Sequence, residues 1–178
     1  MREKGVHIVD IYTRKGDEGW TTLINGAKIP KYDERIELNG IIDELNSWLG
    51  MAKAWDAGYG QGQYQETISA IQRNLMKIMS GVADPGNPGY AFPASETALL
   101  EHRIDELESS FPREKAFVLY GGCELSARLD MARSTARRAE RRFAKVAQLY
   151  GADREAMKYM NRLSDFLYVL ARRADYDR

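Results

Sequence analysis

The chain has 178 residues, and its 26 Lys and Arg residues balance its 26 Asp and Glu residues, so the formal net charge is zero. This length suffices for a substantial core, and a neutral chain lacks the basic excess that favours nucleic acid as a partner. No run is apolar enough to cross a membrane, no apolar signal core follows the first residue, and a single cysteine excludes an intramolecular disulfide. We therefore expect a cytoplasmic protein that binds neither membrane nor nucleic acid.

The chain divides into an arm and a helical part. Residues 1–35 predict an irregular, ordered arm, because glycines, threonines and charges follow one another there without strand or helix periodicity. From residue 36 onward, apolar residues recur at helical spacing in five segments, which predict an all-α fold, a five-helix antiparallel bundle at 36–178. The whole chain is expected to be one domain, with Asp153 as N-cap of the last helix. The expected core positions are Leu38, Ile42, Leu45, Leu49, Ala52, Ile68, Ile71, Leu75, Ile78, Val82, Leu100, Ile104, Leu107, Leu125, Leu129, Ala132, Ala136, Ala139, Phe143, Val146, Tyr150, Ala156, Met160, Leu163, Leu167, Leu170 and Ala174.

Within the arm, the segment YTRKGDEGWTT at 12–22 has the composition of an anion-binding loop. Its glycines let several backbone N–H groups point at one anion, and its hydroxyl and cationic side chains add donors. These residues are Thr13, Arg14, Lys15, Gly16, Gly19, Thr21 and Thr22. Asp17 could hold a magnesium ion, directly or through water. The alternative is an ordinary polar turn before a helix.

The fourth predicted helix carries arginines at every fourth position, Arg133, Arg137 and Arg141, so they form a stripe beside its apolar face. Arginine supplies planar, bidentate donors that suit phosphate, which makes this helix a candidate phosphate-binding platform. The alternative is a solvated helix face with four-apart ion pairs, in which Arg137 and Arg141 flank Glu140.

Three further residues are candidates, each with a structural alternative. Asp43 in IIDELNS borders a core position and would seek an arginine partner, or it is an exposed acidic residue. Asn161 adjoins Met160 and, if half-buried, would have a specific hydrogen bond, or it only packs between helices. Phe117 in FVLYGG either plugs the end of the bundle or projects into a ligand pocket.

Together these segments resemble the PduO-type ATP:cob(I)alamin adenosyltransferases. YTRKGDEGWTTLING is similar to that family's motif YTRxGDxGxTxLxxG, and KYDERIELNGIIDELNSWLG is similar to KxDxRxxAxGxxDELNxxxG. FVLYGG corresponds to FxLPGG, and ARSTARRAERR and MKYMNRLSDFLYVLAR match two C-terminal signatures. The resemblance covers residues 11–55 and 117–175 in the family's order. Three positions depart from it: Asn39 replaces a common tyrosine, Tyr120 the proline of LPGG, and Asp130 a frequent histidine.

The resemblance implies a homotrimer that binds MgATP between subunits, with Mg²⁺ held mainly through the nucleotide. The arm of one subunit and the arginine helix of its neighbour would form the site. The implied ATP-binding residues are Thr13, Arg14, Gly16, Asp17, Thr21, Thr22 and Lys31 on the arm, and Arg137, Glu140 and Asn161 on the bundle. The implied catalytic residues are Arg137, Arg133, Asp43 and Phe117. Arg133 would pair with Asp43 across the subunit boundary, and Phe117 would lie against the lower face of the corrin ring.

The resemblance also implies an activity: transfer of the 5′-deoxyadenosyl group of ATP to the cobalt of cob(I)alamin, with release of triphosphate. An electron-donor reductase and an acceptor enzyme that uses adenosylcobalamin are the implied partners. Two alternatives stay open. One is a non-catalytic corrinoid or nucleotide carrier on the same fold, and the other is a helical protein that presents the arginine helix to an acidic partner.

Overall fold

The computed structural model describes residues 12, 14–112 and 117–178 of the chain. This part is mostly helical, which confirms the predicted fold class. Its five α-helices are α1 (Glu34–Gly58), α2 (Gln65–Ala83), α3 (Ala94–Ser109), α4 (Glu124–Tyr150) and α5 (Arg154–Tyr176). A 3₁₀ turn, η1 (Pro88–Tyr90), and two strands, β1 (Trp20–Thr22) and β2 (Lys28–Pro30), complete the described elements.

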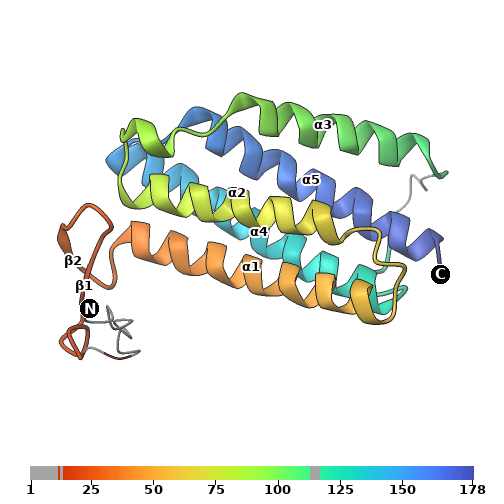
Figure 1. Cartoon of the computed structure of the whole chain (residues 1–178), viewed down its shortest axis with the longest axis horizontal. Coiled ribbons are helices and arrows are strands. Elements are labelled where there is room, and N and C mark those ends of the chain that lie inside the picture. Colours follow the sequence, from red (N-terminus) through yellow and green to blue (C-terminus); the bar gives the residue numbers. More distant parts are fainter. Residues whose placement is uncertain (1–11, 13, 113–116) are drawn as a thin grey trace, which may run out of the picture.

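The five helices lie side by side along the long axis of the molecule (Figure 1). Helix α1 packs against α2 and α4, and α5 packs against α4 and α3, so the order around the bundle is α2, α1, α4, α5, α3. One continuous core joins all five helices. The predicted core positions of α1, α2 and α5 are all buried, whereas Ile104 and Leu107 of α3 are only partly buried.

Side-chain caps begin both α5, where the sequence predicts one, and α1, where it was not predicted. Asp153 accepts hydrogen bonds from the backbone N–H groups of Glu155 and Ala156, at 2.8 and 3.1 Å, which confirms it as the N-cap of α5. Asp33 caps α1 and accepts from the backbone and the guanidinium of Arg35. The Arg35 side chain holds the pKa of the Asp33 carboxyl below its usual value.

The arm differs from the irregular segment that the sequence predicts, because it contains an antiparallel hairpin of β1 and β2. Each strand has only three residues, too few for a visible alternation of apolar and polar positions. The turn between them uses Gly26 at φ 86°, a backbone conformation that favours glycine. Leu23 and Ile29 pack against the start of α1 and the end of α2, so the hairpin is anchored to the bundle.

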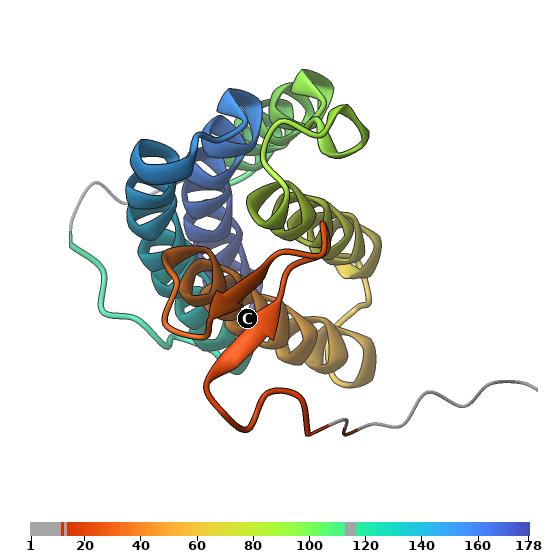
Figure 2. The same cartoon turned by 90° about the vertical axis from the view of Figure 1, so that its left-hand side faces the viewer.

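The arm and the FVLYGG segment lie at opposite ends of the bundle (Figure 1). The hairpin lies where α1 begins and α4 ends, and Figure 2 shows it crossing that end of the molecule. The hydroxyl of Tyr150, the last residue of α4, donates to Asp33 at 3.2 Å, which ties the two elements together there. Residues 117–122 enter α4 at the other end.

Candidate functional site

The helix with the arginine stripe is α4, and its start is fixed by a reciprocal cap. The sulfur of Cys123 accepts a hydrogen bond from the backbone N–H of Ser126, and the hydroxyl of Ser126 accepts one from the backbone N–H of Cys123. This pair satisfies two backbone donors that a helix start otherwise leaves open. Cys123 therefore has a structural role at the helix start.

One side of α4 is buried between α1 and α5. Ala132, Ala136 and Ala139 have no exposed surface, so the neighbouring helices approach α4 closely. The predicted core positions of α4 are buried, with one exception: Tyr150 is 38% exposed and lies at the helix end beside the hairpin. The burial of one side leaves two flanks of α4, one toward α1 and one toward α5, with an exposed face between them.

The cations of the flank toward α1 are all held in ion pairs. Arg138 pairs with Glu44, and Arg142 and Lys145 pair with Glu34 at the start of α1. These hydrogen bonds lower the pKa of the Glu34 carboxyl, Lys145 having the largest effect. The cations of this flank therefore hold α4 against α1 and are not available to a ligand.

The exposed face of α4 differs from that flank. Arg137 and Arg141 are exposed, and neither makes a hydrogen bond or ion pair with any residue that the structure describes. The ion pairs with Glu140 that a simple solvated face would show are absent from this described part. Two adjacent, uncompensated guanidinium groups are a favourable environment for a polyanion.

Glu140 has a different partner, and that partner is another predicted site residue. The side-chain amide of Asn161 on α5 donates to the Glu140 carboxylate at 2.8 Å. The amide oxygen of Asn161 accepts from Arg162 at 2.9 Å, and Arg162 also donates to Glu101 on α3. Asn161 has these hydrogen bonds although it is exposed and not half-buried. The structure thus brings Arg137, Glu140 and Asn161 to one surface of α4 and α5.

The predicted arm residues form a second group. Two successive turns, in which Asp17 N–H donates to the Arg14 carbonyl and Gly19 N–H to the Gly16 carbonyl, curl the chain before β1. The Lys31 ammonium lies against Gly16, where an added Cβ would be 3.0 Å from it. Arg14 has a positive φ of 59°. Cations, a glycine turn and the β1 threonines, Thr21 and Thr22, are therefore neighbours, while Thr13 lies outside the described residues.

The two groups are far apart within one chain. Tyr150 contacts the base of the arm, and Arg137 lies thirteen residues before it on α4. At a rise of 1.5 Å per residue, Arg137 and the base of the arm are about 20 Å apart along the axis of α4. One subunit therefore does not bring its own arm and its own Arg137 together.

Asp43 and Arg133, the other implied pair, are also not in contact within the chain. Asp43 is exposed on α1, and its carbonyl accepts from the Ser47 hydroxyl. Arg133 is largely buried, and its Nε donates to Asp130 at 2.9 Å. Their pairing across a subunit boundary stays a prediction.

Phe117, the first residue of the 117–122 segment, is fully exposed, so it does not fill the core of its own subunit. Leu119 is also exposed, and Tyr120 is 60% exposed, which leaves an apolar edge beside the start of α4. Gly121, at φ 88°, turns the chain toward the helix, and the carbonyl of Gly122 accepts from Arg178 at 2.6 Å.

Sequence reasoning missed a buried charged cluster next to this segment. Asp130 is 6% exposed and accepts from both Arg133 and Arg172, the latter at 2.6 Å and itself 5% exposed. Arg172 also pairs with Asp175 at 3.1 Å. Asp130 directly follows the core residue Leu129, and a carboxylate beside a core position was the sequence signal that could have located the cluster.

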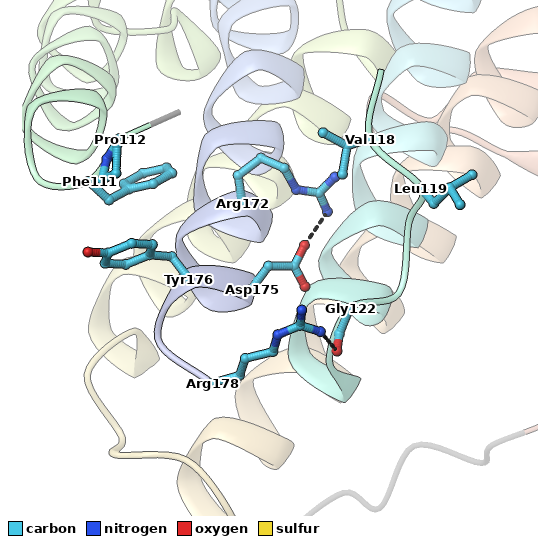
Figure 3. Close-up of a pocket in the computed structure, with 9 residues that line it drawn as sticks. All are labelled: Phe111, Pro112, Val118, Leu119, Gly122, Arg172, Asp175, Tyr176 and Arg178. Atoms are coloured by element: carbon cyan, nitrogen blue, oxygen red, sulfur yellow. Dashed lines mark hydrogen bonds and ion pairs between the residues drawn. The ribbon is translucent and has the colours of Figure 1, made fainter. Parts of the chain in front are cut away.

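A cavity of about 300 Å³ lies on the inner side of the segment, between it and the end of α5 (Figure 3). Val118, Leu119 and Gly122 line one side, and Arg172, Asp175 and Arg178 line the other. Its charges face one another, as the Arg172–Asp175 contact in Figure 3 shows. None of the predicted site residues lines this cavity, so it is not part of the predicted site.

The fold and site define an all-α protein with a glycine-rich cationic arm and a helix face whose two exposed arginines have no partner among the described residues. A family model described as cobalamin adenosyltransferase matches residues 11–174. The chain belongs to this family. In the part of the chain that the structure describes, no helix is both long and apolar enough to cross a membrane.

Relatives in several organisms are similar over nearly the whole chain. The corrinoid adenosyltransferase PduO of Salmonella typhimurium is 36% identical over 171 residues, which cover 94% of this chain and 50% of that protein. The chain thus spans about half the length of that relative. The corrinoid adenosyltransferase of Mycobacterium tuberculosis is 37% identical, with 97% and 92% covered, and human MMAB is 35% identical, with 96% and 71% covered.

Solved structures show the same fold. A phenylalanine-to-alanine variant of the PduO-type ATP:corrinoid adenosyltransferase from Lactobacillus reuteri, complexed with cobalamin and ATP, superposes with a TM-score of 0.88. It is 32% identical, and the match covers 94% of each chain. An arginine-to-lysine variant of that enzyme, complexed with ATP, gives a TM-score of 0.86 at 33% identity, with 93% of this chain and 94% of that chain covered.

Proposed function

We propose that the protein is a corrinoid adenosyltransferase that moves the 5′-deoxyadenosyl group of ATP to the cobalt of cob(I)alamin. The observation that carries the proposal is the exposed α4 face, where Arg137 and Arg141 lack partners among the described residues and adjoin the Glu140–Asn161 pair. Membership of the cobalamin adenosyltransferase family and the likeness to a structure complexed with cobalamin and ATP support these two ligands for the protein.

The residue types suit this reaction. The electron pair of Co(I) attacks the 5′ carbon of ATP, a cobalt–carbon bond forms, and the bond from that carbon to the triphosphate oxygen breaks. Triphosphate leaves with the bonding pair, so no general base is required. The transition state instead needs cations around the growing negative charge, and Arg137, Arg14 and Lys31 supply them.

Magnesium fits this arrangement as a companion of the nucleotide. No cluster of three or more His, Cys, Asp or Glu side chains that could hold a metal occurs among the described residues. Mg²⁺ commonly binds through substrate phosphates, one or two carboxylates and water. Asp17 on the arm and Glu140 on α4 are the carboxylates that could assist, and the ion would neutralise part of the triphosphate charge.

Phe117 has the exposure that a corrinoid contact requires. An apolar ring against the lower face of the corrin would exclude the lower axial ligand of Co(II), and the four-coordinate ion is easier to reduce to Co(I). The packing of Phe117 against the corrin would in this way make the cobalt easier to reduce. An electron-donor reductase would supply the electron, and an adenosylcobalamin-dependent enzyme would receive the product.

The active assembly would be a homotrimer with sites shared between subunits. The separation of about 20 Å between the levels of the arm and of Arg137 in one chain supports this arrangement. A neighbour related by a three-fold axis could place its own arm beside Arg137, and Asp43 of one subunit could then reach Arg133 of another.

A turnover assay tests the proposed function. Purified protein would be mixed with MgATP and chemically reduced cob(I)alamin under anaerobic conditions, and both products would be measured. We expect adenosylcobalamin and triphosphate in equal amounts. A protein that binds ATP and cobalamin in titrations but forms neither product would instead be the carrier that the sequence leaves open, and the transferase assignment would be wrong.

A further inference from the structure

Two of the positions where this chain departs from the family motif meet in space. Tyr120 is in the segment before α4, and Asp130 is in the second turn of α4. Both contact the same two side chains, Arg133 on α4 and Arg172 on α5. The two departures are therefore parts of one local structure.

The contacts form a layered arrangement. The two oxygens of Asp130 accept separately, one from Nε of Arg133 at 2.9 Å and the other from Nη2 of Arg172 at 2.6 Å. The Tyr120 ring lies over both guanidinium groups, with its centroid 4.8 Å from Cζ of Arg133 and 5.5 Å from Cζ of Arg172. The Tyr168 ring is also 5.5 Å from Cζ of Arg172.

We propose that Asp130 and Tyr120 are positioning residues for the corrinoid. Asp130 fixes the two guanidinium groups, and Tyr120 uses them as a platform that holds the Phe117–Gly122 segment against α4. The tether would thereby place Phe117 where the corrin ring binds. This inference rests on the proposed function, because it assigns the contacts of Tyr120 and Asp130 to the corrinoid side of that same site.

The exposure of the segment explains why it needs a tether. Phe117 and Leu119 are 109% and 93% exposed, so neither holds the segment in place. Gly121 adds backbone freedom immediately after Tyr120. Cation–π contacts of Tyr120 with two guanidinium groups give the segment a fixed point next to Phe117.

The charge of Asp130 matters as much as its shape. Arg133 and Arg172 are both largely buried, and although Arg172 also pairs with Asp175, Asp130 is the carboxylate that lies between the two guanidinium groups and offsets their repulsion. Asp130 uses only Nε of Arg133, and no described residue accepts from the two terminal nitrogens of Arg133. Those nitrogens stay available for Asp43 of a neighbouring subunit.

Two substitutions at Tyr120 separate the ring from the hydroxyl, which makes no hydrogen bond with any described residue. Tyr120→Phe keeps the cation–π contacts, and Tyr120→Leu removes them at an exposed position where folding is not at risk. We expect Tyr120→Leu to raise the KM for cob(I)alamin about tenfold, given two contacts of this kind. The KM for ATP should change less than twofold, and Tyr120→Phe should match the wild type.

Asp130→Asn tests the charge with nearly unchanged shape. It should raise the corrinoid KM in the same direction as Tyr120→Leu, and combining the two changes should add little, because they remove the same tether. Glu124→Gln is the control: it makes the same charge change on α4, at an exposed ion pair with Arg128. If Asp130→Asn does not fold, the two Tyr120 variants still test whether the segment is tethered and whether the tether affects the corrinoid KM.

Hydrogen exchange of the backbone amides at 118–122, measured on the protein without substrates, gives a readout independent of turnover. We expect faster exchange in Tyr120→Leu and Asp130→Asn, and wild-type exchange in Tyr120→Phe and Glu124→Gln. Unchanged exchange in Tyr120→Leu would overturn the tether, even if the enzyme is active. Faster exchange with an unchanged corrinoid KM would overturn its role in positioning. A wild type that forms no adenosylcobalamin would refute the proposed function itself. The exchange rates would still show whether Tyr120 and Asp130 hold the segment in place.

Discussion

Arginines on α4 that look equivalent in the sequence have different roles in the structure. Arg138 faces Glu44 of α1, whereas Arg137, its neighbour in the chain, is exposed and has no partner among the described residues. An exposed guanidinium without a partner contributes little to folding, but it can stabilise a polyanionic leaving group. The two residues therefore make a matched pair for mutagenesis.

We expect Arg137→Ala to leave the free energy of unfolding within about 0.5 kcal/mol of wild type, because it opens no core cavity. Loss of a charge-assisted contact to phosphate should lower kcat/KM by an amount equal to about 2–5 kcal/mol. Arg138→Ala should lose only an exposed ion pair, at most about 1 kcal/mol of stability, and keep its activity. Steady-state kinetics and urea unfolding measure both effects, and equal kcat/KM values for Arg137→Ala and wild type would remove Arg137 from the ATP site.

Phe117→Ala distinguishes a corrinoid contact from a structural residue. A core plug would cost about 3–5 kcal/mol of stability, but the side chain is 109% exposed, so we expect almost no loss. If Phe117 contacts the corrin, the variant should leave Co(II) five-coordinate and should fail with cob(II)alamin plus a mild reductant. It should keep much more activity when Co(I) is supplied ready-made. A four-coordinate spectrum of Co(II) in the variant with MgATP would contradict this role.

Tyr159 makes the stability of the bundle depend on alkaline pH. Burial raises the pKa of its hydroxyl from 10.0 to about 12, against the opposing effect of the Asn74 side-chain amide, which donates to its oxygen at 3.3 Å. The folded state thus favours the protonated phenol. This contribution, about 2–3 kcal/mol, is fully present below pH 10 and is lost as the pH rises toward 12.

Tyr159→Phe should remove this dependence at a cost of about 1 kcal/mol at neutral pH, because one hydrogen bond is lost. Urea unfolding from pH 8 upward should show a shallower alkaline fall in the variant than in the wild type. Tyr176→Phe, at an exposed ring, controls for the loss of a hydroxyl. Identical alkaline slopes for wild type and Tyr159→Phe would show that this group does not titrate between the two states.

At the scale of elements, α4 serves two functions on separate faces. Its alanines allow α1 and α5 to approach, and its arginines occupy the surface that remains. Ala136 has no exposed surface, so Ala136→Leu should force the neighbouring helices apart and cost about 1–3 kcal/mol of stability. Urea unfolding measures this, with Arg137→Ala, one residue away, as the control. Wild-type stability of Ala136→Leu would mean that α4 is less tightly packed than its burial indicates.

The helices could be predicted from the sequence because each buries one periodic stripe, and the stripes of α1, α2 and α5 lie in the core as expected. The hairpin could not be, because three-residue strands show no period. What orders them is tertiary: Leu23 and Ile29 pack against Ile36 of α1 and against Ala83 of α2, which lies more than fifty residues further along the chain.

The candidate site was only partly predictable for a related reason. The stripe of arginines is a local pattern, and it located Arg137 on the exposed face of α4. The partners of its members are not local: Asn161 meets Glu140 from another helix, and Arg172 joins Arg133 through Asp130. Because Asp130 already neutralises Arg133, loss of Asp43 would not leave that arginine without a counter-charge.

At the scale of the whole molecule, α4 separates the groups that the chemistry needs together. It runs about 40 Å, from the Phe117–Gly122 segment to the hairpin, with Arg137 between them. A single chain therefore has an arm that cannot serve its own Arg137. A closed ring of three subunits would solve this problem, because each arm would complete the site of the next subunit.

Mixed trimers test this arrangement. One variant, Arg137→Ala, keeps a functional arm, and the other, Arg14→Ala with Lys31→Ala, keeps a functional α4 face. The arm variant preserves the hairpin, because Arg14 and Lys31 are exposed and the anchoring side chains are unchanged. Each variant alone should be inactive.

In randomly assembled trimers from an equal mixture, a site is intact when its arm comes from the first variant and its α4 face from the second, which holds for about one quarter of sites. Coexpression with two affinity tags would isolate mixed trimers, each with one intact site of three, so activity near about one third of wild type is expected. Inactive trimers of proven mixed composition would show instead that each site is built from one subunit, and the arm would then have to reach Arg137 by a rearrangement of its own chain.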